Sequence, residues 1–261
     1  MKTPSVYVPG PARYPRILAY HEISSRFQLG ITGTTPRRFK IHLDFLKQAG
    51  WEIVPLRGLS DRSPGNGVCL TFDDGYSSFY HEVLPLLIEG GIPATLFIIT
   101  DYVGDFNRWD ITFGINRRRH LDWDQIRRIR AAGIEIGSHT CSHRDLTRLP
   151  PLELEREVRD SRKVLEDRLG EAVTSLALPF GAVNLEVITR TRQAGYTEIC
   201  GSVPGLRGPL AGVLPRLPVY RMDGRKTLKR KLDFHPGELL RLSLLHGCSL
   251  GTRWLQTGSQ R

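Results

Sequence analysis

The stretch "GVCLTFDDGY", residues 67–76, joins an apolar run to two adjacent carboxylates and a glycine. A short apolar run of this kind is typical of a buried strand in a parallel sheet. Neighbouring residues on a strand face opposite ways, but a turn at Gly75 lets Asp73 and Asp74 point into one cleft. Functional sites of parallel α/β folds lie at the carboxyl ends of the strands. An aspartate before a helix is also a common N-cap, so the stretch alone leaves a structural role open.

Further apolar runs alternate with helix-period segments along the chain. The other predicted strands cover residues 16–21, 94–100, 134–138, 175–180 and 196–201, with a last strand at "LPVY", 217–220. The predicted helices cover residues 36–49, 76–91, 123–132, 150–169 and 184–194. Strand–helix alternation with short connections predicts a mostly parallel sheet. We therefore expect one barrel-like α/β domain.

Composition and termini restrict the protein class. With 261 residues, 40% hydrophobic and 25% charged, the chain has the composition of an ordinary globular protein. Its four cysteines form no CxxC pair and are expected to be reduced thiols. No apolar window approaches the ~18 residues of a membrane span. Prolines interrupt the N-terminal stretch where a signal peptide needs an apolar run, so we expect a cytoplasmic protein.

The net charge of +10 is concentrated near the C-terminus. Residues 207–261 hold eleven Lys or Arg against three Asp or Glu. Such a segment can bind an acidic membrane surface or an anionic lipid carrier, which would make the protein peripheral to the membrane, or it can be a solvated basic surface. No nucleic-acid motif accompanies it, so no nucleic-acid partner is expected.

A second strand also ends in polar residues. "IGSHTCSH", residues 136–143, places His139 and His143 four apart after an apolar run. Together with Asp74 they would form a set of two histidines and one carboxylate, which holds a divalent ion and leaves positions for water and substrate. Asp73 would remain free to take a proton from a water bound to the ion.

The motifs "TFDDG", "SHTCSH" and "LPFGAVN" in this order resemble the polysaccharide deacetylase family, the NodB homology domain of carbohydrate esterase family 4. The resemblance covers residues 16–220, and it is closest to the exopolysaccharide or poly-N-acetylglucosamine deacetylase branch. It implies a distorted (β/α)7 barrel that removes N-acetyl groups from sugars, with Asp73 as the base and a divalent metal, Zn²⁺ by preference, on Asp74, His139 and His143. Residues 1–15 would then be an extension and residues 221–261 a basic, leucine-rich helical tail.

The chain departs from the family pattern at two places. Many members have an arginine where this chain has Ala177, which leaves the orientation of Asp73 without an explanation; Pro179, Phe180 and Gly181 would line the cleft. Many members also end with a Leu-x-His motif that supplies the general acid. "LLH", 244–246, lies beyond the last expected strand. In the poly-N-acetylglucosamine deacetylase branch that the chain resembles, the histidine comes early, which implies His21, after the first strand, as the acid. A histidine near the ion, on the side opposite to Asp73, could protonate the leaving amine at neutral pH; a buried structural histidine is the alternative.

The remaining expectations concern substrate contacts and rival functions. Tyr76 would donate its backbone N–H to the oxyanion, while the rings of Tyr76, Phe180, Trp109 and Trp123 could stack on a sugar or pack in the core. The histidines at 42, 81, 120 and 235 are expected at the surface. A hydrolase of another non-peptide C–N bond, of the deformylase or amidase type, remains an alternative. A non-catalytic carbohydrate-binding protein is a further one.

Overall fold

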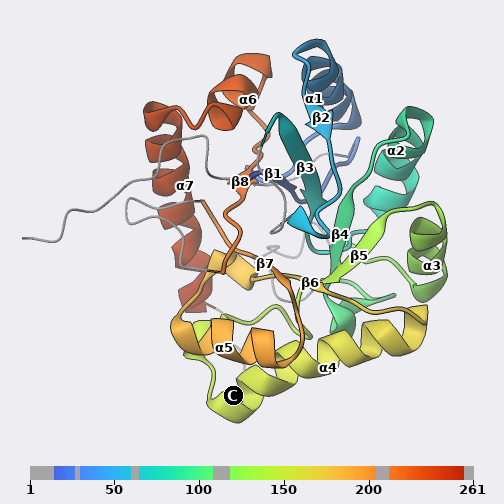
Figure 1. Cartoon of the computed structure of the whole chain (residues 1–261), viewed down its shortest axis with the longest axis vertical. Helices are drawn as coiled ribbons and strands as arrows, with labels where there is room; N and C mark the ends of the chain where they lie inside the picture. The colour runs from blue at the N-terminus through green and yellow to red at the C-terminus, as the bar shows by residue number, and fades with distance from the viewer. Residues whose placement is uncertain (1–14, 27–29, 60–64, 108–117, 204–211, 256–261) are drawn as a thin grey trace, which may run out of the picture.

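The computed structural model describes residues 15–26, 30–59, 65–107, 118–203 and 212–255, with side chains as far as residue 245. The strands of this part gather at the centre and the helices lie around the outside (Figure 1). Seven of the described strands lie in the order β7-β6-β5-β4-β3-β1-β8, and every paired neighbour is parallel. The predicted distorted (β/α)7 barrel is confirmed.

The strands form where the apolar runs predicted them. They are β1 (Arg16–Tyr20), β3 (Gly67–Phe72), β4 (Thr95–Ile98), β5 (Glu135–Ser138), β6 (Ser175–Ala177), β7 (Glu198–Cys200) and β8 (Leu217–Pro218). The sequence missed β2 (Glu52–Ile53), which pairs with the beginning of β3. A strand of two residues shows no periodicity, so no sequence pattern could predict it.

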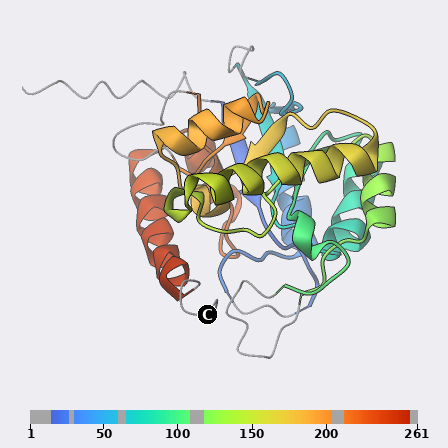
Figure 2. The same ribbon diagram turned by 90° about the horizontal axis from the view of Figure 1, so that it is seen from below.

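The helices lie around the outside of the curled sheet, and α4 and α5 cross in front of it in the view of Figure 2. They are α1 (Pro36–Gln48), α2 (Leu84–Gly90), α3 (Trp123–Ala131), α4 (Pro151–Leu169), α5 (Leu185–Gln193), α6 (Arg225–Leu232) and α7 (Pro236–Leu255). The predicted helix at 76–91 is instead a wide π-type turn, η3 (Phe79–Val83), followed by α2. Pro85 lacks the N–H that would continue a regular α-helix from the preceding turn.

Local sequence signals explain where individual helices begin. Asp122 and Gln125 form a reciprocal capping box at the start of α3, as their spacing predicted. Asn184 caps α5 by accepting a hydrogen bond from the Val187 N–H. These caps fix the residues at which α3 and α5 begin.

The segment before β8 closes the barrel. The Leu214 N–H donates to the Ile199 oxygen at 2.7 Å, and the Gly201 N–H donates to the Leu214 oxygen at 2.9 Å, so residue 214 pairs with β7. Three residues later, Leu217 pairs with Leu18 of β1. This segment therefore joins the two ends of the strand row, and it brings residues near 216 into the barrel interior.

Helices α6 and α7 pack onto the barrel. Leu228 and Leu232 belong to the same buried cluster as the strands. The buried Asp223 carboxylate accepts hydrogen bonds from Lys231 at 2.6 Å and from Arg241 at 2.8 Å. The domain boundary at residue 220 stays a prediction, but the chain beyond it shares the barrel's core. Among the described residues, no helix combines the length and apolar character that crossing a bilayer requires.

Candidate metal centre

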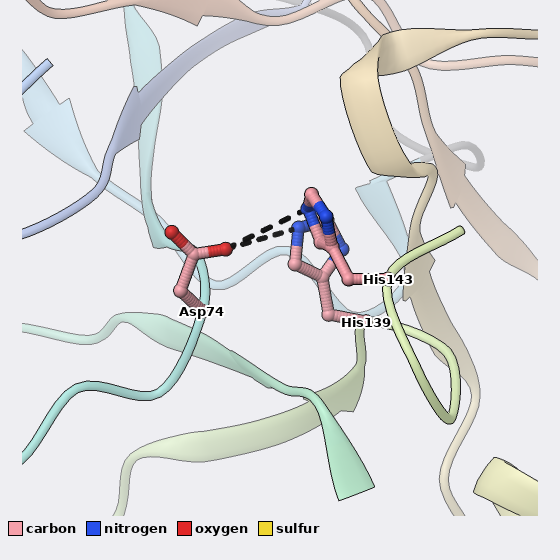
Figure 3. Close-up of side chains that lie close together, drawn as sticks. All are labelled: Asp74, His139 and His143. Carbon is pink, nitrogen blue, oxygen red and sulfur yellow. Dashed lines mark ion pairs between the residues drawn. The ribbon is translucent and has the colours of Figure 1, made fainter. Parts of the chain in front are cut away.

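Three buried side chains from two strand ends meet at one edge of the barrel. The Asp74 Oδ1 atom lies 3.6 Å from His139 Nε2 and 3.7 Å from His143 Nε2 (Figure 3). One ligand atom from each of the three residues lies within 4.8 Å of the other two. The structure thus brings together the three residues that the sequence predicted as metal ligands.

The donor set fits a divalent ion. Separations of 3.6 and 3.7 Å exceed hydrogen-bond length. They are close to the ~3.4 Å between two ligands of a tetrahedral ion with bonds of about 2.1 Å. Two imidazole nitrogens and one carboxylate oxygen suit Zn²⁺ and other borderline divalent ions. Asp74, His139 and His143 can therefore hold such an ion.

The turn after β3 presents Asp74 through an unusual backbone. Asp74 and Gly75 have φ values of 70° and 66°, in the left-handed region that non-glycine residues rarely occupy. A Cβ at Gly75 would also lie 2.9 Å from the Ile98 side chain, so glycine is required there. The buried His120 donates from Nδ1 to the Asp74 carbonyl at 2.8 Å. This bond holds the turn that points Asp74 at the histidines.

The loop after β5 presents the two imidazoles. The His139 Nδ1–H donates to the Ala177 carbonyl at 2.8 Å. Because that nitrogen carries the proton, Nε2 keeps its lone pair and faces Asp74. His143 has a φ of 59°, again left-handed, and its ring lies edge-on to the His139 ring with centroids 4.7 Å apart.

Burial keeps both histidines in the form that binds a metal. Desolvation lowers the pKa of His139 to about 4, although the Asp73 charge opposes it. Desolvation also lowers the pKa of His143 well below its usual value, and the neighbouring His139 adds to the effect. Both imidazoles are therefore neutral at neutral pH, as ligation requires.

Asp73 is held apart from the three ligands by Arg216. The Arg216 guanidinium donates to both carboxylate oxygens, at 2.6 Å and 2.7 Å. Burial alone would raise the pKa of Asp73, but the Arg216 charge and hydrogen bonds, with His139, outweigh it and hold the pKa well below its usual range. Asp73 is therefore an oriented, ionised carboxylate.

Arg216 is the site residue that the sequence missed. It also donates to Thr71 Oγ1 at 3.2 Å and lies against the Phe97 ring, within the barrel interior. The small Ala177, where many family members carry arginine, belongs to the same buried cluster as Phe97. The only signal available was an arginine directly before the last strand, in "PRLPVY".

His21 lies beside Asp73. Its Nε2 atom is 4.0 Å from Asp73 Oδ2, and its side chain is 28% exposed. The expected placement on the side of the ion opposite to Asp73 is therefore wrong, because β1 and β3 are neighbours and bring both residues out of the sheet together.

Of the four predicted substrate-binding residues, Phe180 lies beside a histidine of the centre. The ring centroid of Phe180 lies 4.9 Å from that of His143, and Phe180 has a φ of 58°. Pro179 is buried and Gly181 is half-buried. Tyr76 is buried as well, with its ring 4.9 Å from His120 and its hydroxyl accepting a hydrogen bond from Arg118. The roles of these four residues toward a substrate stay predictions.

Two histidines expected at the surface are in fact buried. His42 is bonded to the Tyr20 hydroxyl at 3.0 Å and to the Asp223 carbonyl at 2.9 Å. His120 bonds Asp74 as described, and burial lowers its pKa to about 4. Sequence context failed here because each partner comes from a distant segment. Trp109 and the His246 side chain lie outside the described residues, while Trp123 is half-buried with Arg168 over its ring.

Comparison with known proteins agrees with this geometry. The profile of the family described as "Polysaccharide deacetylase" matches residues 60–199. The protein YxkH of Bacillus subtilis (strain 168), which carries the same family name, is 30% identical over 201 residues, covering 75% of this chain and 66% of its own length. A chitooligosaccharide deacetylase of Bradyrhizobium sp. (strain ANU 289) is 30% identical over 190 residues, covering 66% of this chain and 80% of that protein.

A solved structure supports the fold. IcaB from Ammonifex degensii superposes with a TM-score of 0.72 at 23% identity, covering 85% of this chain and 97% of that one. At 23% identity, this similarity supports the fold alone.

Proposed function

This chain belongs to the polysaccharide deacetylase family of hydrolases, and we propose that it removes N-acetyl groups from an N-acetylated sugar with the help of a divalent metal ion, Zn²⁺ by preference. The observation that carries the proposal is the buried set of Asp74, His139 and His143 beside a second, separately held carboxylate, Asp73. A relative acts on chitooligosaccharides, according to its name, which supports a substrate built of N-acetylglucosamine.

The side chains divide the proton transfers of amide hydrolysis between them. A bound divalent ion supplies Lewis-acid polarisation of the acetamide carbonyl and activation of a water molecule. Asp73, which is ionised, accepts a proton from the attacking water. His21 donates a proton to the leaving nitrogen, so that the C–N bond breaks, the sugar keeps a free amino group and the acyl group leaves as acetate. The Tyr76 backbone N–H, next to the turn at Gly75, donates a hydrogen bond to the developing oxyanion in this proposal.

Arg216 gives Asp73 its role as a base. A carboxylate whose two oxygens are held by a guanidinium fork cannot rotate away from the cleft, and it stays ionised at neutral pH. The same fork prevents Asp73 from joining Asp74 as a ligand. The two neighbouring aspartates therefore have different proposed roles, because Asp73 is bound by Arg216 and Asp74 faces the two histidines.

Acetate release tests the proposed reaction. The purified protein, loaded with Zn²⁺, would be incubated with chitooligosaccharides and, in parallel, with a panel of simple amides and formamides. We expect acetate from the sugars in equimolar amount with new amino groups. Release from the simple amides alone would favour the rival amidase activity. Sugar binding without any acetate would favour a carbohydrate-binding protein.

We also propose that the basic surface of α6 meets an acidic lipid surface or an anionic lipid-linked glycan. Arg225, Lys226 and Arg230 are exposed on this helix, and clustered bases near a negatively charged surface attract it electrostatically. Co-sedimentation with anionic and with neutral vesicles tests this. The variant Arg225→Ala/Lys226→Ala should bind anionic vesicles less than the control Arg127→Ala/Arg128→Ala, whose exposed pair lies on α3. Equal binding by both variants contradicts the proposal.

Two further expectations from the sequence stay predictions. A poly-N-acetylglucosamine-like or lipid-linked glycan is the substrate we expect, and a deacetylation screen with mass detection would identify it. The cytoplasmic location, peripheral to the membrane, is checked by fractionating cells that produce the protein.

A further inference from the structure

The loop between the two histidine ligands has an unusual hydrogen-bond arrangement. Four successive backbone N–H groups, those of residues 140–143, all donate to side-chain oxygens. Thr140 N donates to Ser138 Oγ, Cys141 N and Ser142 N to Glu157 Oε2, and His143 N to Thr140 Oγ1, at distances of 3.1, 2.9, 2.9 and 3.2 Å. Two of the four therefore depend on one oxygen of Glu157, which belongs to α4.

This loop needs support because its backbone is strained. Thr140 and His143 have φ values of 67° and 59°, and such left-handed conformations persist in non-glycine residues only where the surroundings impose them. On the carbonyl side, the N–H groups of Thr100 and Asp101 hold the oxygens of Thr140 and Cys141. On the N–H side, Glu157 is the contact from another element.

Glu157 serves the loop rather than an ion pair. Its side chain is 7% exposed, and its other oxygen, Oε1, accepts from the Ser142 hydroxyl. Within the described residues, the hydrogen bonds to its carboxylate all come from Cys141 and Ser142, and no lysine or arginine is paired with it. A buried carboxylate without a cation is tolerated only when hydrogen bonds to it are strong, so the loop and the glutamate depend on each other.

We propose that Glu157 is a positioning residue for the metal centre: it fixes the backbone between His139 and His143 so that both Nε2 atoms face Asp74 before any ion arrives. The inference rests on the proposed function, because it presumes that these three side chains bind an ion. Preorganisation of this kind appears in the affinity for the ion, since a loop that must be ordered on binding reduces that affinity.

Metal affinity measured against a chromophoric chelator tests the proposal. The full chain, its Glu157→Gln variant and a Glu166→Gln control would be titrated with Zn²⁺, and their Co²⁺ forms compared by visible absorption. Glu166 lies on the same helix and also accepts a backbone N–H, that of Val173 at 3.0 Å, but it holds a segment away from the histidines. Thermal unfolding of the metal-free proteins reports any general loss of stability.

We expect Glu157→Gln to bind Zn²⁺ roughly 10–100-fold more weakly than the unaltered chain and to change the Co²⁺ spectrum, while Glu166→Gln lowers only the unfolding temperature. If Glu157→Gln keeps full affinity and an unchanged spectrum, the glutamate is merely structural and the inference is wrong. If the unaltered chain itself binds no ion, the proposed function fails instead.

Hydrogen exchange gives a second test that needs no variant. The amide protons of Cys141 and Ser142 should exchange slowly in the metal-free protein, because both are bonded to Glu157. Free exchange of both amides would overturn the inference even if Glu157→Gln proved unable to fold.

Discussion

Arg216 and Asp73 lie 143 positions apart in the sequence, yet the guanidinium of one grips both oxygens of the other at 2.6 and 2.7 Å. Both side chains of the pair are buried. The pair explains how Asp73 is oriented although this chain has Ala177 where many family members have an arginine. The arginine that holds Asp73 belongs to the segment before β8 instead of to the motif that contains Ala177.

Replacing this arginine should damage both stability and catalysis. Arg216→Met leaves the Asp73 charge buried and unpaired, so we expect the free energy of unfolding to fall by roughly 3–5 kcal/mol. Arg216→Lys keeps the charge but loses the fork, so acetate release should fall while less stability is lost. Urea unfolding and acetate assays measure the two effects. The control Arg192→Lys, at an exposed arginine that donates to backbone carbonyls, should leave catalysis unchanged. Equal activity of Arg216→Lys and Arg192→Lys would contradict the role of the two guanidinium hydrogen bonds to Asp73.

Asp73→Asn should abolish hydrolysis without releasing the metal. The amide cannot accept the proton of the attacking water, and we expect a loss of about 10²–10⁴-fold in kcat. Asp73 contacts Arg216 rather than the histidines, so elemental analysis should find the same metal content as in the unaltered protein. Activity retained in this variant would refute the assignment of the base.

Asp74→Ala and His143→Ala should instead lose the metal. Each variant removes one of three side chains whose ligand atoms lie within 4.8 Å of one another. The two remaining ligands would bind a divalent ion far more weakly. Elemental analysis after gel filtration measures the content. Chelation of the unaltered protein should abolish acetate release, and added Zn²⁺ should restore it. Full activity after verified metal removal would contradict a metal-dependent reaction.

His21→Gln should slow the reaction and leave the metal centre intact. The ring lies 4.0 Å from Asp73 and is partly exposed, so its loss removes a proton donor without opening the core. We expect kcat to fall by about 10²-fold or more, with unchanged metal content and unfolding temperature. His81→Gln, at an exposed histidine after β3, is the matched control. Equal kcat values for the two variants would exclude His21 as the general acid.

The buried His42 should make stability depend on pH. Burial lowers the pKa of His42 below the usual value of about 6.5. The ring contacts the Tyr20 hydroxyl and the Asp223 carbonyl. The positive charges of Arg38 and Lys231 also disfavour protonation of the ring. Below pH 6.5 the unfolded chain binds a proton that the folded chain does not, so the free energy of unfolding falls as the pH falls, by at most about 1.4 kcal/mol per unit for this residue. Urea titrations should show a shallower dependence for His42→Gln; identical slopes would contradict this.

Much of the barrel could be predicted because its signals are local. The strand at 67–72 forms at the predicted residues, since six consecutive residues suited to a buried strand need no distant information. Asp122 and Gln125 form their capping box for the same reason. The expected helix at 76–91 is interrupted for a local reason, because Pro85 lies within it. Local signals fail at β2, which exists only because β3 offers it a partner.

The sequence by itself determined the chemical inventory: two carboxylates at one strand end and two histidines at another, each set within a few residues. Only the tertiary structure decided their duties. Asp73 suits the proposed role of base because Arg216 holds both its oxygens, and Asp74 suits the proposed role of ligand because its left-handed turn aims it at the histidines. The physical reason is that residue type fixes what a group can do, whereas its charge state and direction depend on neighbours from distant parts of the chain, 143 positions away in the case of Asp73 and Arg216.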